Sequence, residues 1–294
     1  MDKDKEYEKM EVLKEPYNST CITSITACFM LSVIFVSSLY IWNSPHGSEH
    51  PSTIKKRFFS VFIMMFISPL ILYISLGCDV LNKNTIWDLL GLRIPGLLTA
   101  TVIPLLLTMT LFLGPLTLHT INGLWALYRE PMYWVNSLGN LVWIRNHIVA
   151  PLSEEFAFRA CMLPLLVQCF QPMTAVFICP LFFGAAHLHH LVGRVKLGME
   201  FKKALSISCF QFLYTTVFGA YSAFLFLRTG HFIAPFLAHA FCNHMGFPDI
   251  TELMIYKVPQ RVVMILVYIL GVVAWCLLLN PLTNPLWYSN NIFF

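Results

Sequence analysis

Two adjacent glutamates, Glu154 and Glu155, lie inside an apolar stretch of the sequence, and Arg159 follows them. They are the only acidic residues between Met132 and Met199. On a helix, Glu155 and Arg159 share one face and can form an ion pair, whereas Glu154 points about 100° away. Acidic residues inside a membrane are usually functional. A carboxylate placed in this way is a candidate general base that takes a proton from water.

The residues just before the pair predict the start of a helix. Pro151 suits the first turn and Ser153 is a preferred N-cap. Both glutamates would then occupy the first helical turn, where the helix dipole favours negative charge and burial opposes it. The motif alone leaves an alternative open, in which Arg159 merely neutralises a structural pair that caps the helix.

A histidine follows in a second apolar segment. Phe183 and His187 are four residues apart and share a helix face, and the small residues between them permit close packing. His187 is therefore a candidate catalytic residue. The neighbouring His189 and His190 are more simply explained as polar residues at the membrane surface.

A third segment carries His239 and Asn243, again four residues apart, so both side chains can aim at one point. Two hydrogen-bond donors that converge on a developing oxyanion stabilise the transition state of acyl transfer. A hydrogen-bonded pair between helices is the commoner role of such residues, so this motif is not decisive alone.

The composition places these residues in a membrane protein. Hydrophobic residues make up 57% of the chain, charged residues 12%, and the mean hydropathy is +0.68, whereas an average soluble domain is about 25% charged. Apolar runs of spanning length lie near 20–42, 58–76, 97–118, 173–190, 204–228 and 262–280, and two shorter runs with polar residues lie near 154–168 and 230–247. We expect an all-α fold, a polytopic membrane bundle of about eight transmembrane helices with an intramembrane catalytic cavity. Residues 1–294 are expected to form one domain.

The net charge and the cysteine content say less about fold and function than the apolar runs do. The net charge is +4, and the basic residues at 55–57, 194–196 and 202–203 are predicted to flank membrane surfaces. The nine cysteines show no disulfide spacing, so we expect small, buried, unpaired apolar residues.

The ordered set Glu154-Glu155-x-x-x-Arg159, Phe183-x-x-x-His187 and His239-x-x-x-Asn243 resembles the Abi family of membrane proteases. More closely, it is similar to the eukaryotic type II CAAX prenyl endopeptidases, the Ras-converting enzymes. The motifs span about 140–247.

The resemblance implies an endoplasmic-reticulum enzyme that removes the last three residues of farnesylated or geranylgeranylated proteins. It implies that Glu154 and His187 activate water, and that His239 and Asn243 stabilise the oxyanion. Glu155, Arg159 and Phe183 would support the site. Prenylated CAAX proteins such as Ras-type GTPases would be the substrates, membrane lipid would surround the enzyme, and no metal, cofactor or nucleic acid is expected.

Other functions remain open at the level of sequence. His187, His239 and Glu154 could instead bind zinc, although the sequence lacks an HExxH motif. Cys161 could act as a nucleophile. The chain could also be a transporter or a scaffold, because buried polar residues bind solutes and join helices equally well, but it lacks the half-chain symmetry that many transporters show.

Overall fold

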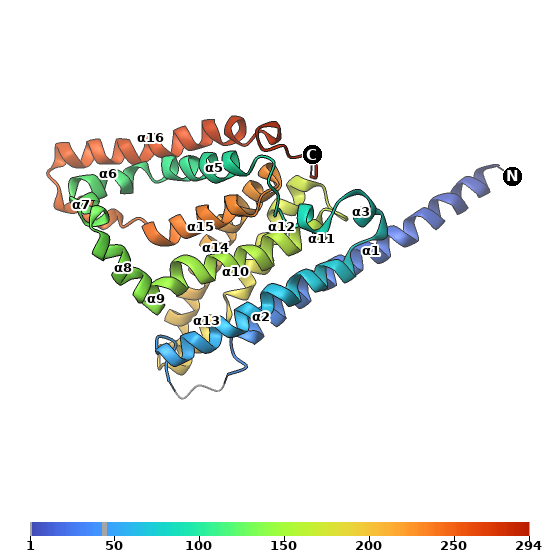
Figure 1. The fold of residues 1–294 in the computed structure, drawn as a ribbon, viewed down its shortest axis with the longest axis horizontal. Coiled ribbons are helices and arrows are strands. Elements are labelled where there is room, and N and C mark those ends of the chain that lie inside the picture. The colour runs from blue at the N-terminus through green and yellow to red at the C-terminus, as the bar shows by residue number, and fades with distance from the viewer. Residues whose placement is uncertain (1, 43–45, 294) are drawn as a thin grey trace.

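In the computed structural model, which describes residues 2–42 and 46–293, every regular element is helical (Figure 1). The α-helices are α1 (Asp2–Ser38), α2 (Pro51–Ser75), α3 (Cys78–Lys83), α4 (Ile86–Leu89), α5 (Leu97–Leu111), α6 (Leu113–Ile121), α7 (Leu124–Arg129), α8 (Pro131–Gly139), α9 (Leu141–Ile144), α10 (Ala150–Glu155), α11 (Met162–Leu166), α12 (Pro172–Ala186), α13 (His189–Lys196), α14 (Phe201–Thr229), α15 (Ile233–Met245) and α16 (Val258–Leu282). Two π-helical turns cover Arg145–Val149 and Phe156–Cys161, and two 3₁₀ turns cover Ile250–Ile255 and Pro285–Tyr288. The expected all-α class is confirmed.

Within the described residues, five helical segments are long and apolar enough to cross a membrane, and a bent pair raises this number to six. The chain is thus a multi-pass membrane protein, but the expected count of about eight spans is not confirmed. The bent pair is α5 and α6, which meet at 76°. Pro115 explains the break, because it cannot donate a hydrogen bond to the carbonyl of Leu111 and its ring crowds that group.

The helices form a wedge around a central segment (Figure 1). Helices α1 and α2 pack against each other along one side, while α5 packs against α15 and α16 on the opposite side. Between these sides, α12 packs against α14, and α14 contacts α15. This arrangement brings the three motif-bearing segments, in α10, α12 and α15, into the middle of the bundle.

The central segment is one continuous helical run from α9 to α11, and it corrects the predicted helix start. The run begins at Asn140, whose side chain accepts hydrogen bonds from the backbone of Val142 and Trp143. Ser153 is not an N-cap, because its hydroxyl donates to the Val149 and Ala150 carbonyls inside the helix. The two glutamates therefore lie in mid-helix, and the helix dipole cannot be what holds them.

Two prolines account for the π-helical turns in this run. Pro151 and Pro164 each lack the N–H that would bond to the residue four positions earlier, and each stands two or three residues after a π-helical turn. Such turns occur often at functional sites. All residues from 155 to 166 are buried, so this helix forms the centre of the hydrophobic core.

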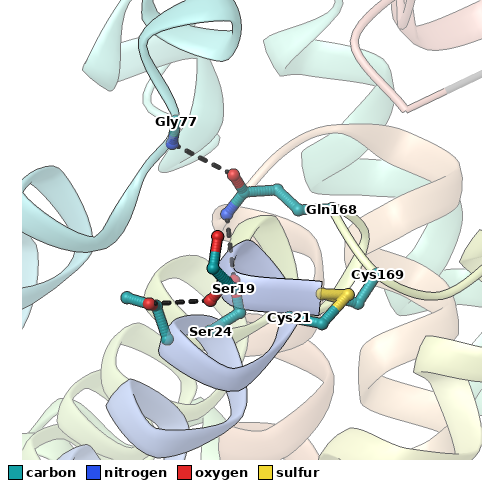
Figure 2. Close-up of a disulfide and its surroundings, with 7 residues drawn as sticks. Ser19, Cys21, Ser24, Gly77, Gln168 and Cys169 are labelled. Atoms are coloured by element: carbon teal, nitrogen blue, oxygen red, sulfur yellow. Dashed lines mark hydrogen bonds between the residues drawn. A yellow bond between two sulfur atoms is a disulfide. The ribbon is translucent and has the colours of Figure 1, made fainter. Parts of the chain in front are cut away.

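Contrary to the expectation for the cysteines, Cys21 and Cys169 form a disulfide (Figure 2). The bond joins α1 to the loop after α11, and Gln168 strengthens the junction by accepting from the Gly77 backbone at 3.1 Å and donating to Ser24 at 3.3 Å. The two cysteines are 148 residues apart. Only the packing of α1 on α11 brings them together, and no local spacing could reveal it.

Candidate active site

The side chain of Glu155 is fully buried and holds the site together. Its Oε1 atom lies 3.2 Å from Nη1 of Arg159, which is also fully buried, and this confirms the ion pair expected four residues apart. The Ser222 hydroxyl of α14 donates to Oε2 of Glu155. Arg159 also lies over the Phe183 ring, 4.2 Å from its centroid, so one buried cation links the α10 segment to α12.

His239 reaches from α15 to both glutamates. Its Nδ1 atom lies 2.7 Å from Oε1 of Glu155, and its Nε2 atom lies 3.9 Å from Oε2 of Glu154. Because Glu155 pairs with Arg159 and accepts from Ser222, it acts as an ionised acceptor, and Nδ1 of His239 must carry the donated proton. The other ring nitrogen then faces Glu154.

His187 has a defined orientation at the C-terminal end of α12. Its Nδ1 atom lies 2.8 Å from the Phe183 carbonyl oxygen, and its ring packs edge-on against Phe183 at 4.7 Å between centroids. A carbonyl oxygen only accepts hydrogen bonds, so Nδ1 carries the proton, and in the neutral ring Nε2 keeps its lone pair. The expected shared face of Phe183 and His187 is confirmed.

Glu154, His187 and Phe183 line one cavity of about 630 Å³, a size typical of ligand sites. The Glu154 side chain is 22% exposed, whereas that of Glu155 is 0% exposed. Water can therefore reach Glu154 but not its neighbour. The two adjacent glutamates occupy different environments, as the helical geometry of the motif predicts.

Asn243 is placed differently. It is exposed and does not line the cavity itself. Its amide donates a hydrogen bond of 2.8 Å to the backbone carbonyl of Asn146, a residue that does line the cavity. The structure thus places Glu154 and His187 in one cavity, whereas His239 contacts the two glutamates and, like Asn243, does not itself line the cavity.

Several residues of the site carry no motif in the sequence. Ser222 lies in the long apolar run of α14, where a lone serine gives little signal, yet it binds Glu155. Arg57 and Arg194 were expected at the membrane surface, and both line the cavity. His189 and His190 also line it. These residues line the cavity because separate helices pack together there, and their spacing in the sequence does not indicate it.

Neither of the alternative chemistries gains support from the geometry. Among the residues that the structure describes, no three His, Cys, Asp or Glu side chains are grouped in a way that could hold a metal ion. Glu154, His187 and His239, the alternative zinc ligands, do not form such a group. Cys161 is fully buried in the core, where a substrate cannot reach its thiol.

Comparison with known proteins agrees with this geometry. A family model described as type II CAAX prenyl endopeptidase Rce1-like matches residues 136–245. The chain is 43% identical to a human CAAX prenyl protease 2, with 92% of this chain and 84% of that protein covered. It is 33% identical to the Arabidopsis thaliana protein of the same name, with coverage of 91% and 92%, and 31% identical to that of Saccharomyces cerevisiae, with coverage of 77% and 80%. No solved structure matches the chain. With its motifs in one site and such relatives along nearly its whole length, the chain belongs to the CAAX prenyl protease 2 family of membrane proteases.

Proposed function

We propose that this protein removes the last three residues of prenylated CAAX proteins, with Glu154 and His187 activating the attacking water. The observation that carries the proposal is that these two side chains line one cavity while Glu154 alone of the glutamate pair is open to water. The substrate class comes from the names of the relatives, each a CAAX prenyl protease 2.

In the proposed first step, a water molecule between Glu154 and His187 gives up a proton and attacks the carbonyl carbon of the prenylated cysteine. The lone pair on Nε2 of His187 and the Glu154 carboxylate are the two acceptors available to it. The proton is later returned to the leaving amine, so that a carboxyl group and a free tripeptide result. General acid–base catalysis of this kind contributes about 10²- to 10⁴-fold to rate.

His239 and Asn243 are proposed to stabilise the oxyanion. Since Nδ1 of His239 is committed to Glu155 at 2.7 Å, donation to an oxyanion must come from Nε2, which requires the doubly protonated ring. Asn243 has two amide hydrogens, and one remains after its bond to Asn146.

The apolar wall of the same cavity suits the lipid part of the substrate. The residues that line it include Phe35 and Val36 of α1, Leu39 just after α1, and Phe58 and Val61 of α2. Each CH₂ group of a prenyl chain buried there contributes about 0.8 kcal/mol, which favours a substrate that arrives through the membrane. Ras-type GTPases are our proposed substrates and the endoplasmic reticulum is our proposed location.

The test is cleavage of a farnesylated C-terminal peptide and its unmodified counterpart by the purified protein, followed by mass spectrometry. We expect loss of three residues from the farnesylated peptide only. Glu154→Gln should abolish it, whereas Glu130→Gln, which changes an exposed carboxylate just before α8, should retain it. A wild-type protein that cuts neither peptide would refute the proposal.

The same assay separates the competing chemistries. Zinc-dependent hydrolysis predicts that a chelator stops cleavage and that added Zn²⁺ restores it, and we expect no effect of either. A cysteine mechanism predicts that Cys161→Ala is inactive, and we expect this variant to cleave normally.

A further inference from the structure

Two arginines in the cavity wall have no acidic partner among the residues that the structure describes. Arg57 lies on α2 and Arg194 on α13, and both are half-buried and line the cavity that contains Glu154. No carboxylate of the described residues forms an ion pair with either. A guanidinium half removed from water without a counter-charge is costly, so each position calls for a reason beyond surface anchoring.

The hydrogen bonds of the two arginines leave donors unused. Arg194 donates only to neutral groups of α14, Ser208 at 2.7 Å and Gln211 at 2.7 Å, which fix the guanidinium in place without neutralising it. The Nε atom of Arg57 is buried and has no hydrogen-bond partner among the described residues, while its guanidinium stacks over Tyr40 at 5.8 Å. Five N–H donors per arginine leave capacity for an anionic ligand.

Arg145 provides the contrast within the same cavity. Its Nη2 atom forms an ion pair of 3.1 Å with Glu49, and its Nε donates to the Asn146 side chain. Its charge is therefore compensated inside the protein. Lys196 also lines the cavity but is exposed and can be hydrated. Arg57 and Arg194 remain as the two half-buried, uncompensated cations.

We propose that Arg57 and Arg194 form a subsite for the free C-terminal carboxylate of the substrate, an inference that rests on the proposed function. Arginine binds carboxylates with strong, charge-assisted and often bidentate hydrogen bonds. The proposed substrate ends in a carboxylate three residues beyond the scissile bond. Fully extended, three residues span about 10 Å, so a peptide whose scissile bond lies at Glu154 presents this anion elsewhere in the same cavity.

The subsite has a chemical consequence. By binding the terminal carboxylate, it would hold the chain terminus at a fixed distance from Glu154. The enzyme would then release three residues and would not cut internal peptide bonds next to other cysteines. Prenyl binding at the apolar wall would fix one end of the substrate, and the two arginines would fix its other end.

The experiment compares kcat/KM for two farnesylated peptides that differ only in a C-terminal acid or a C-terminal amide. The scissile bond is the same in both, and only the terminal charge is removed. We expect wild type to favour the acid by about 10- to 100-fold, as for a hydrogen bond to a charged group. In Arg57→Gln/Arg194→Gln this preference should fall below about threefold, while Arg57→Lys/Arg194→Lys, which keeps the charges but not the bidentate geometry, should give an intermediate preference.

The amide peptide is the internal control for folding, because structural damage to the α13–α14 contact slows both peptides, whereas loss of the subsite slows only the acid. Arg145→Gln, at the compensated arginine, should keep the wild-type preference. Equal rates for acid and amide in wild type, as expected if the arginines bind lipid phosphate instead, would overturn the subsite. Cleavage of neither peptide would instead overturn the proposed function.

Discussion

Removal of the Arg159 charge tests how the site is held together. Glu155 and Arg159 have no exposed side-chain surface and lie 3.2 Å apart. In Arg159→Met, the aliphatic stem of the side chain is retained, but Glu155 keeps only His239 and Ser222 as partners. The variant therefore leaves a buried carboxylate without its full counter-charge.

Breaking a buried ion pair by removing one partner costs about 3 to 5 kcal/mol. For a chain of this size, each kcal/mol shifts the melting temperature by about 2 to 4 °C, so we expect a decrease of about 6 to 20 °C. Removal of both charges in Glu155→Gln/Arg159→Met should be much milder, because no buried charge is left unpaired. We expect the double variant to recover at least about 2 kcal/mol relative to Arg159→Met.

The assay is thermal unfolding of the detergent-purified proteins, with the four members of the double-mutant cycle measured side by side. A decrease for Arg159→Met together with recovery in the double variant would support a buried, coupled pair. If the effects of the two single substitutions simply add, the residues do not interact as the structure indicates, and the reasoning is refuted.

Three further outcomes are expected. Gly219→Ala would place a Cβ atom 2.9 Å from Cβ of Pro180 and 3.0 Å from Nη2 of Arg159, so overpacking should lower the free energy of unfolding by about 1 to 3 kcal/mol. Gly139→Ala is the control: its Cβ would have nothing within 4 Å, and the melting temperature should not fall. Reduction of the disulfide, or Cys21→Ser, should cost about 4 to 5 kcal/mol of stability because the bond closes a long loop, and an unchanged melting temperature under reductant would contradict this. Disulfides persist in the endoplasmic-reticulum lumen, so we expect the end of α1 that carries Cys21 to face the lumen. A glycosylation sequon inserted after Cys169 should then be modified, and one inserted at Gly47, beyond the other end of α1, should not. The reverse pattern would show that the Cys21 end of α1 faces the cytosol.

The residue types and the helical period were enough to predict two of the three chemistry-bearing pairs, but the expected convergence of His239 and Asn243 on one point is not confirmed. Glu155 and Arg159, and Phe183 and His187, contact each other as their four-residue spacing predicts. The apolar runs likewise predicted the long helices, because bilayer-length segments depend on local composition alone. Both features depend on residues close together in the chain, so they can be predicted from one sequence.

Features that depend on distant packing could not be predicted. The start of the central helix was misplaced because Pro151 and Ser153 resemble a helix start, whereas the helix continues through π-helical turns from Asn140. The pairing of Cys21 with Cys169 and the place of Arg57 in the cavity wall both follow from the packing of α1 and α2 on other elements. The count of about eight spans is not confirmed, because α15 is shorter than a membrane span and π-helical turns interrupt the run from α9 to α11.

The central claim is that Glu154 and His187 act together on one water molecule. The most direct measurement is single-turnover cleavage of a farnesylated peptide by Glu154→Gln, His187→Gln and the double variant. Residues that act as a unit give non-additive losses. We predict that each single variant is slower by about 10²-fold or more and that the double variant is about as slow as the slower single one. A double variant whose loss equals the product of the single losses, or a single variant with wild-type rate, would contradict the account.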